Sequence, residues 1–375
     1  MKLLIPGPVE LDSTVSNAMA KPIMGHRTPI FSEILNECWS ILKEIYNTRN
    51  DIALITGSGT SAMEAAVASV VKDSDEVVVI EGGKFGERFG EISEAFGAKV
   101  NTVPVEWGKS FTKEDVEKVV SDSNAKVITL THNETSTGVI HNAEIVGKIA
   151  REYDMLFIMD AVTSLGGDVV ETDKWGVDLC VSGSQKCLAA PPGLGFVAVS
   201  NKAYEAMENN QKRKAYYLDL LRYRKALKKE TTPYTPSVSL IYGLNTALLR
   251  IKDEGINVRI ERHRKLARVF REAVKAMNLE LFADSSCASN TVTSIKIPED
   301  MNDDDIRGNL LREFEILVAG GQAHVKGKIF RIGHMGNVQF GDIIQVLGAM
   351  EIILKRKGHS FKLGEGVKTA LEEFL

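Results

Sequence analysis

Several features of other protein classes are missing from this 375-residue chain. No apolar run approaches the ~18 residues that a transmembrane helix needs, and the apolar start at residues 1–6 is too short for a secretory signal. The cysteines form no CxxC pair, and a chain of this length needs no disulfide staples. We therefore expect a cytoplasmic protein that crosses no membrane. The four cysteines are Cys38, Cys180, Cys187 and Cys287.

An excess of charge of one sign is also missing. The chain has 46 basic and 50 acidic residues, a formal net charge of −4. This balance does not indicate nucleic acid or an anionic membrane as the main partner. We interpret the local basic patch, which consists of the run at residues 212–214 followed by Arg222, Arg224, Lys225, Lys228 and Lys229, as a solvated helix face. No cluster of His, Asp and Glu with metal-ligand spacing accompanies the motifs below, so no metal is expected.

What the chain does have is an alternation of strands and helices. Short runs rich in β-branched residues predict strands that are buried on both faces, and amphipathic stretches between them predict helices. The alternation indicates an α/β fold with a mostly parallel sheet, whose ligands bind at the carboxyl ends of the strands. The strands are expected at 52–56, 76–80, 126–130, 155–159, 178–182 and 195–199, and the helices at 60–71, 86–95, 113–121 and 143–152.

The pattern changes after residue 200, and the length already favours two domains. Helices are expected at 202–230, 237–254, 257–277, 303–314 and 340–355, with short strands at 292–297, 316–318 and 328–332. We predict an N-terminal segment at 1–14, a large domain at 15–255 and a smaller C-terminal α/β domain at 256–375.

Three motifs follow predicted strands. The first, TGSGTSA at 56–62, opens a helix, and N–H groups at a helix start together with Ser58 and Thr60 suit a phosphate. An ordinary helix cap has the same composition. The second is Asp160, at the end of the apolar run MLFIM. A carboxylate there needs a partner, such as a protonated ring nitrogen.

The third motif is SGSQKCL at 182–188, followed by a Pro-Pro-Gly turn. A lysine in an apolar pocket loses its proton readily and becomes an amine nucleophile, whereas most loop lysines are solvated. Together, Lys186, Asp160 and the turn at 58–60 offer an amine for an aldehyde, a carboxylate for a pyridinium and donors for a phosphate. These are the requirements of pyridoxal 5′-phosphate (PLP).

Segments spread over nearly the whole chain resemble the class V, fold-type I PLP-dependent aminotransferases, and more narrowly the alanine–glyoxylate / serine–pyruvate aminotransferase group. They come in the family's order. The segments are PGPVELD (6–12), MGHRTPIF (24–31), TGSGTSAMEAA (56–66), HNETSTGVI (132–140), MDAVTSLGG (159–167), SGSQKCLAAPPGLGF (182–196), TPSVSLIYGL (235–244) and FRIGHMG (330–336).

The resemblance implies a role for each matching residue. Lys186 forms the Schiff base and moves the substrate's α-proton, while Asp160 binds the ring nitrogen. Phe85 stacks on the ring and Val162 packs on its other face. Thr235 reaches the phosphate of the neighbouring subunit, so a homodimer is implied. The implied cofactor-binding residues are Ser58, Gly59, Thr60, Phe85, Thr135, Asp160, Val162, Ser184, Gln185, Lys186 and Thr235. Whether Thr232 or Tyr234 touches the cofactor stays open.

On the substrate side, the resemblance assigns the α-carboxylate to Arg331 of the R-I-G motif, with Gly7 lying against the substrate. A guanidinium binds a carboxylate with two parallel hydrogen bonds. Ile329, Phe330 and Ile332 make the strand around Arg331 look buried, which disfavours the alternative of a surface arginine.

The implied reaction is transamination from a small amino acid, alanine or serine, to a 2-oxo acid such as glyoxylate or pyruvate. An aspartate or broad-specificity activity stays open, because Arg27 could bind a second carboxylate. Two alternatives are a class V cysteine desulfurase or lyase, with Cys287 as the candidate nucleophile, and a non-catalytic PLP-binding subunit.

Overall fold

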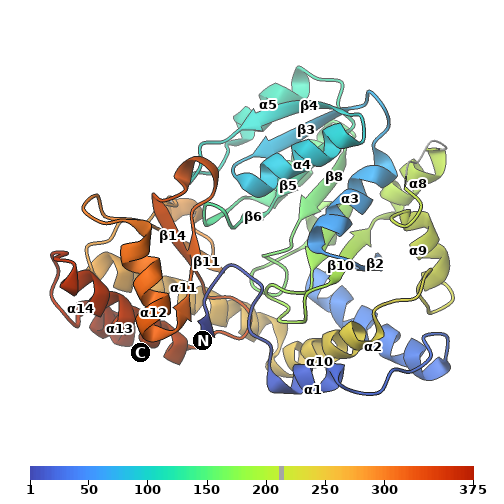
Figure 1. Ribbon diagram of the computed structural model, residues 1–375. Coiled ribbons are helices and arrows are strands. Elements are labelled where there is room, and N and C mark those ends of the chain that lie inside the picture. Colours follow the sequence, from blue (N-terminus) through green and yellow to red (C-terminus); the bar gives the residue numbers. More distant parts are fainter. Residues whose placement is uncertain (211–214) are drawn as a thin grey trace.

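The computed structural model describes residues 1–210 and 215–375 (Figure 1), so the basic run at 212–214 lies outside the described residues. A seven-stranded sheet forms the centre of the larger lobe, and only β10 runs antiparallel to its neighbours. The predicted mostly parallel α/β sheet is therefore confirmed. Its strands, in spatial order, are β2 (Asp51–Thr56), β10 (Leu194–Val199), β9 (Leu179–Gly183), β8 (Leu156–Asp160), β5 (Val127–Thr131), β3 (Glu76–Glu81) and β4 (Lys99–Pro104).

Two hydrophobic cores cover the two faces of this sheet. In β2, Ile52 and Leu54 point into one core while Ala53 and Ile55 point into the other, because successive side chains of a strand alternate. The first core packs against α2 (Pro29–Tyr46), α5 (Lys113–Ser121), α6 (Ala143–Glu152) and α10 (Val238–Glu254), with α1 (Ser13–Met19) at its edge. The second packs against α3 (Gly59–Val70), α4 (Lys84–Ala95), α8 (Asn201–Asn209) and α9 (Leu220–Leu227).

The sheet topology brings the predicted motifs to one edge. β8 and β9 are neighbouring parallel strands, with Asp160 paired to Val181. β2 is antiparallel to β10, which is antiparallel to β9, so β2 runs in the same direction as β8 and β9. The turn after β2, the end of β8 and the loop after β9 therefore lie at the same carboxyl edge.

The C-terminal part forms a second lobe beside the first (Figure 1, orange to red). An antiparallel sheet of β11 (Val292–Lys296), β14 (Ile329–Gly333) and β13 (Ala319–Gly320) packs with α11 (Ile256–Ala276), α12 (Asn309–Phe314), α13 (Phe340–Arg356) and α14 (Glu365–Phe374). The N-terminal strand β1 (Lys2–Leu3) pairs with β12 (Ile316–Leu317), so the chain's start joins this lobe. We propose a domain boundary at Gly255, between α10 and α11.

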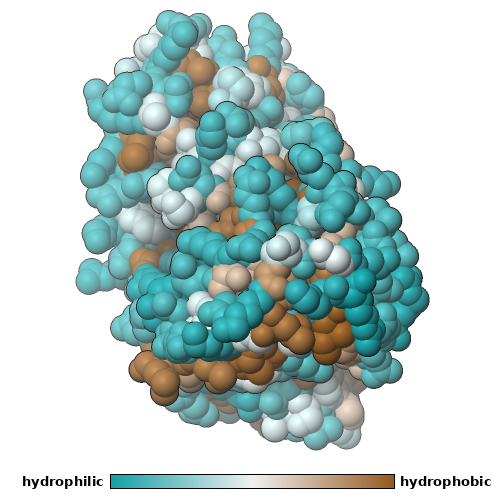
Figure 2. All heavy atoms as spheres, turned by 90° about the vertical axis from the view of Figure 1, so that its left-hand side faces the viewer, coloured by the Kyte–Doolittle hydropathy of each residue, from teal (hydrophilic) through white to brown (hydrophobic). Residues whose placement is uncertain are grey.

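The outer face on the small-lobe side is mostly hydrophilic, with hydrophobic side chains gathered low on it (Figure 2). The exposed large apolar residues of this lobe include Leu311, Ile352, Leu363 and Leu371. In the part of the chain that the structure describes, no helix is long and apolar enough to cross a membrane.

Some sequence predictions need correction. The helix expected over 202–230 is interrupted: α8 ends at Asn209, residues 216–218 form a turn, and α9 begins at Leu220. Likewise, the helix expected over 303–314 begins as a π-helical segment at Asp304–Gly308 before α12. The edge strand β4 escaped prediction because its polar residues face solvent, leaving Val103 as its one buried side chain. Helices α2 and α14 and the short α7 (Thr172–Trp175) were also not predicted.

Candidate active site

Lys186 lies in the loop after β9, where its amine donates a hydrogen bond to the carbonyl oxygen of Pro6. The N-terminal segment passes so close that a side chain at residue 7 would collide with the lysine, and Gly7 also has a φ of 95°, which favours glycine. Burial lowers the pKa of Lys186 to about 8. A substantial fraction of the amine is therefore neutral near physiological pH, as a nucleophile requires.

Asp160 is the last residue of β8 and is 4% exposed. Its Oδ1 accepts a hydrogen bond of 2.7 Å from the backbone N–H of Val162. Burial nevertheless raises the pKa of Asp160 to about 6, because a carboxylate is poorly stabilised in a low-dielectric site. A cation placed against this carboxylate would favour its ionised form.

The turn after β2 opens α3 with Ser58, Gly59 and Thr60. The hydroxyl-bearing residues Ser58 and Thr60 are exposed, whereas Gly59 is buried against Val162. A Cβ added at Gly59 would approach Val162 Cγ2 to 2.9 Å, so a side chain there would push into the cavity wall. The first N–H groups of α3 have no partners within the helix, which suits an anion.

These residues line one cavity of about 110 Å³. The cavity brings together predicted residues from four chain segments that are far apart in sequence. Its lining consists of Ser58, Gly59, Thr60, Met63, Phe85, Arg88, Asn133, Asp160, Val162, Thr163, Gln185 and Lys186.

Three predicted cofactor residues do not line this cavity. The buried Ser184 hydroxyl donates to the carbonyl of Pro191 and accepts from the N–H of Leu194, so it holds its own loop together. Thr135 is buried, and its backbone carbonyl accepts from Arg331. Thr235 is exposed and lines a small hollow together with Leu54 and Thr56 of β2. Neither Thr232 nor Tyr234 reaches the cavity of its own chain, since both line a different hollow.

Arg88 and Asn133 were missed as candidate residues. Asn133 belongs to the quoted HNETSTG motif, but sequence alone gave it no role. Its Nδ2 donates to Thr291 Oγ1 of the small lobe at 2.6 Å, while its Oδ1 is buried without a partner. Arg88 follows Phe85 by three positions on α4, and this helical spacing could have identified it.

The strands β6 (Asn133–Glu134) and β7 (Val139–Ile140) form a hairpin that holds the backbone at Phe85. The buried Glu134 carboxylate accepts from the backbone N–H groups of Phe85 (2.9 Å) and Gly86 (3.1 Å) and from the Ser136 hydroxyl. Burial raises the pKa of Glu134, and these donors oppose the rise. The hairpin thus fixes the first turn of α4, which carries Phe85 into the cavity.

Arg331 is supplied by β14 of the small lobe and is 6% exposed. Its Nε and Nη2 donate to the carbonyl of Gly320 at 2.9 and 2.7 Å, and its Nη1 donates to the carbonyl of Thr135 at 2.8 Å. Burial lowers the pKa of Arg331 to about 10. Its positive charge also helps to lower the pKa of Lys186, which places the two groups within electrostatic reach.

The cavity fits PLP in its chemistry. It offers an amine, a carboxylate and a turn of unpaired N–H and hydroxyl donors, which correspond to the cofactor's aldehyde, ring nitrogen and phosphate. Two polar lining atoms, Asn133 Oδ1 and Gln185 Oε1, are buried without a partner in the described chain. Buried polar atoms are usually satisfied, so these two indicate a ligand that completes them.

The comparison with protein families agrees with this geometry. The family model described as Aminotransferase class-V matches residues 11–341. The chain belongs to the class V aminotransferases. The protein is therefore a PLP-dependent enzyme that transfers amino groups, and its fold is the fold-type I architecture of that family.

Relatives of this class V aminotransferase align over almost its whole length. An uncharacterized aminotransferase of Methanocaldococcus jannaschii is 46% identical, with 100% of this chain and 97% of that one covered. The soluble hydrogenase 42 kDa subunit of Anabaena cylindrica is 41% identical, with coverages of 100% and 98%. The crystal structure of ureidoglycine–glyoxylate aminotransferase from Bacillus subtilis superimposes with a TM-score of 0.95 at 33% identity, covering 99% and 97% of the two chains.

Further relatives of 31 to 33% identity are named for glyoxylate. They are the serine–glyoxylate aminotransferase of Arabidopsis thaliana, the alanine–glyoxylate aminotransferase of Drosophila melanogaster and the L-aspartate–glyoxylate aminotransferase of Paracoccus denitrificans, each aligned over 98 or 99% of this chain.

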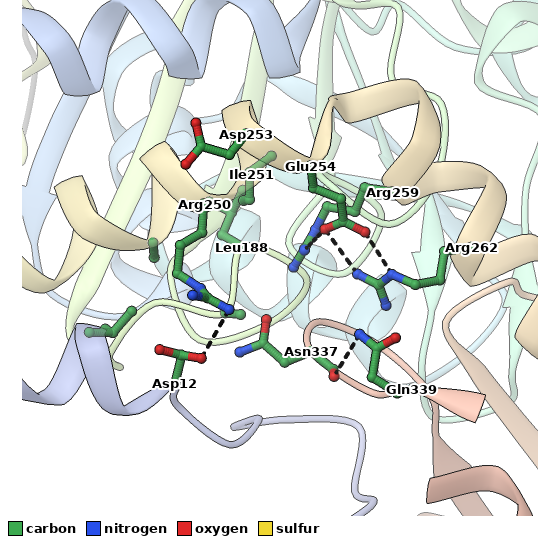
Figure 3. Close-up of a pocket in the computed structure, with 13 residues that line it drawn as sticks. Asp12, Leu188, Arg250, Ile251, Asp253, Glu254, Arg259, Arg262, Asn337 and Gln339 are labelled. Atoms are coloured by element: carbon green, nitrogen blue, oxygen red, sulfur yellow. Dashed lines mark hydrogen bonds and ion pairs between the residues drawn. The ribbon is translucent and has the colours of Figure 1, made fainter. Parts of the chain in front are cut away.

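A larger cavity of the aminotransferase, about 660 Å³, lies between α10, α11 and the N-terminal segment (Figure 3). All its arginines are already paired with carboxylates: Arg250 with Asp12, and both Arg259 and Arg262 with Glu254. Arg259 also donates to the carbonyl of Cys187, next to the lysine, at 2.7 Å. We therefore assign this cavity a structural role behind the Lys186 loop.

Proposed function

We propose that this aminotransferase moves an amino group from a small amino acid, alanine or serine, to a 2-oxo acid, glyoxylate or pyruvate. The observation that carries the proposal is the convergence of Lys186, Asp160 and the turn at 58–60 on one cavity. When bound, PLP acts as an electron sink that lets the α-proton of an amino acid leave.

In this proposal Lys186 has two tasks. Its Nζ would hold the cofactor covalently, and the same Nζ would carry the α-proton of the substrate. The lowered pKa of Lys186 suits both tasks, because a base whose pKa lies near the working pH both accepts and returns a proton. The Pro6 carbonyl that accepts from Nζ orients the amine.

Asp160 would hold the ring nitrogen in its protonated form, and that positive charge would supply the partner that the buried carboxylate lacks. Phe85 and Val162, which both line the cavity, would pack against the flat ring. Ser58, Gly59, Thr60 and Gln185 would hold the phosphate and the ring oxygen.

Arg331 binds the substrate's α-carboxylate, and Gly7 leaves room beside it. In the free protein the guanidinium donates to the carbonyls of Gly320 and Thr135. A carboxylate that takes over two of these hydrogen bonds is held in a fixed plane, which orients the α-carbon towards Lys186. Carboxylate binding thus exchanges hydrogen bonds to neutral backbone carbonyls for hydrogen bonds to an anion.

The preference for a small donor follows from the charges in the site. Arg27, the candidate for a second carboxylate, is exposed and donates to the Thr231 hydroxyl and the Thr232 carbonyl, away from the cavity. Aspartate use would therefore depend on Arg27 from a neighbouring subunit. Relatives named for serine, alanine and aspartate all name glyoxylate as the partner substrate, which supports glyoxylate as acceptor.

A half-reaction assay tests the proposal. The PLP-loaded enzyme is mixed with alanine, serine or aspartate, and the visible absorbance of the bound cofactor is followed. We expect alanine or serine to bleach this band and glyoxylate to restore it. If none of the three amino acids changes the spectrum, transamination of these donors is excluded.

Neither alternative function has comparable support. A desulfurase needs an accessible thiolate, whereas Cys287 is buried and burial raises its thiol pKa. Cys187 is fully buried, and burial raises its pKa to about 12. The hydrogenase subunit of Anabaena cylindrica is a reason to test for a non-catalytic role, which would leave all turnover unaffected by Lys186→Ala.

We further propose a cytoplasmic homodimer. The four cysteines are free and buried, as suits a reducing compartment. Thr235 is exposed and does not line its own chain's cavity, so its proposed phosphate contact requires a neighbouring copy. Ile23, Ile30 and Tyr216 are also exposed and would be available to such an interface. Sedimentation equilibrium of the holoenzyme tests the dimer, and a monomeric, fully active enzyme would contradict it.

A further inference from the structure

The proposed phosphate turn contains no positively charged side chain of its own, although the group it holds is a dianion. Ser58, Gly59 and Thr60 supply N–H and hydroxyl donors only. Two described residues of the cavity lining carry a side-chain cation, Lys186 and Arg88. Lys186 is committed to the other end of the cofactor, so Arg88 is the available cation for the phosphate end.

The side chain of Arg88 lies between the turn and the aromatic ring. Its Nη1 is 3.4 Å from Thr60 Oγ1, and its guanidinium carbon is 4.7 Å from the centre of the Phe85 ring. Arg88 therefore reaches from the first turns of α4 to the first turn of α3. The ring contact fixes the plane of the guanidinium without using up its N–H donors.

Within the part of the chain that the structure describes, no carboxylate forms an ion pair with Arg88. Its helix neighbour Lys84, by contrast, is paired with both Glu87 and Glu91. A guanidinium that lines a small cavity without a counter-ion is suited to an anionic ligand. Planar N–H pairs match phosphate oxygens in geometry as well as in charge.

We propose that Arg88 binds the phosphate group of the cofactor and gives the site its preference for phosphorylated over dephosphorylated pyridoxal. This inference rests on the proposed binding of PLP at Lys186. Arg88 thereby adds a charged contact to the neutral donors of the turn, and Phe85 holds the guanidinium in place.

Equilibrium binding of two ligands to the cofactor-free protein tests the inference. PLP and pyridoxal, which lacks the phosphate, are titrated against wild type, Arg88→Met and Arg88→Lys, with bound ligand measured by absorbance after dialysis. We expect Arg88→Met to weaken PLP binding about 10- to 100-fold, as for the loss of charge-assisted hydrogen bonds, and pyridoxal binding less than about threefold. Arg88→Lys should recover part of the PLP affinity.

Lys84→Met serves as the matched control, since it removes a paired cation from the same helix, and it should leave both affinities unchanged. Inorganic phosphate should compete with PLP for the wild type but only weakly for Arg88→Met. Equal losses for PLP and pyridoxal in both Arg88 variants would overturn the inference and leave Arg88 as a support for Phe85. Failure of the wild type to bind either ligand would instead contradict the proposed function.

Discussion

Polar groups on the large-lobe side of the site include buried atoms without a partner, whereas each nitrogen of the arginine on the small-lobe side already donates to a backbone carbonyl. Asn133 Oδ1 and Gln185 Oε1 are buried without partners, and Asp160 has one backbone donor. Arg331, by contrast, donates from three nitrogens to two backbone carbonyls. The large-lobe side is thus suited to a cofactor that stays bound, and the small-lobe side to a substrate that binds and dissociates in each turnover.

This difference has an energetic reason. A buried polar group without a partner destabilises the folded protein, so it is tolerated where a tightly bound cofactor completes it. A substrate must leave after each turnover. An arginine that returns to its own backbone partners when the substrate leaves avoids an unpaired buried charge in the free enzyme.

Removing the lysine tests the large-lobe side most severely. We expect Lys186→Ala to lower kcat about 10⁴-fold, because the variant loses the group that carries the α-proton. Steady-state transamination with alanine and glyoxylate measures the effect. Lys148→Ala removes an exposed surface lysine and should be fully active. Retention of a tenth or more of wild-type turnover by Lys186→Ala would exclude the assigned role.

The pH dependence of stability tests the same side without the cofactor. Burial raises the pKa of Asp160 from 3.8 to about 6 in the folded protein. As the pH rises, the carboxyl therefore ionises first in the unfolded chain. Above pH 6 the folded protein is destabilised by the full cost of burying the ionised carboxylate. This penalty is about 3 kcal/mol, at about 1.4 kcal/mol per pKa unit. Asp160→Asn should therefore stabilise the cofactor-free protein at pH 8 and have little effect at pH 3.5.

Urea unfolding at the two pH values measures this difference. Asp12→Asn is a control of opposite sign, because the hydrogen bonds from Thr14 lower the pKa of Asp12 and its charge stabilises the folded state. That variant should be less stable than wild type at pH 8. A destabilised Asp160→Asn protein at pH 8 would mean that other groups in the free protein already neutralise the carboxylate.

The small-lobe side is tested by Arg331→Lys. A lysine has one ammonium group and cannot bind a carboxylate with a planar pair of donors, so we expect the KM for alanine to rise about 10- to 100-fold. The KM for alaninamide, which lacks the carboxylate, should change little. Arg307→Lys alters a neighbouring arginine that is paired with Asp303, and it should leave both values unchanged. Equal changes for both substrates would assign Arg331 a structural role.

The sequence predicted the large-lobe side of the site better than the small-lobe side, for a physical reason. Lys186 and Asp160 each follow a buried strand, and parallel neighbouring strands bring such residues to one edge. One partner of Arg331, the carbonyl of Thr135, belongs to a hairpin almost two hundred positions away. No local pattern reveals that contact. The contact between Ser184 and Pro191 was not predicted for the same reason, because the Ser184 hydroxyl closes a loop that only the fold displays.

The smallest expected effect concerns the ring platform, where both sides of the comparison meet. Phe85 lines the large-lobe cavity, but its backbone is held by Glu134 of the hairpin that Arg331 also contacts through Thr135. Replacing the ring with an aliphatic side chain should remove the stacking and the ring contact with Arg88, but it should keep the Glu134 hydrogen bond, which is to the backbone. Stacked aromatic pairs contribute about 0.5–1.5 kcal/mol, so Phe85→Leu should weaken PLP binding about 2- to 10-fold.

Phe85→Trp, measured by the same dialysis assay, should bind PLP at least as tightly as wild type. A loss above 100-fold in Phe85→Leu would mean that the ring acts mainly by positioning Arg88, and comparison of PLP with pyridoxal would then locate the loss at the phosphate.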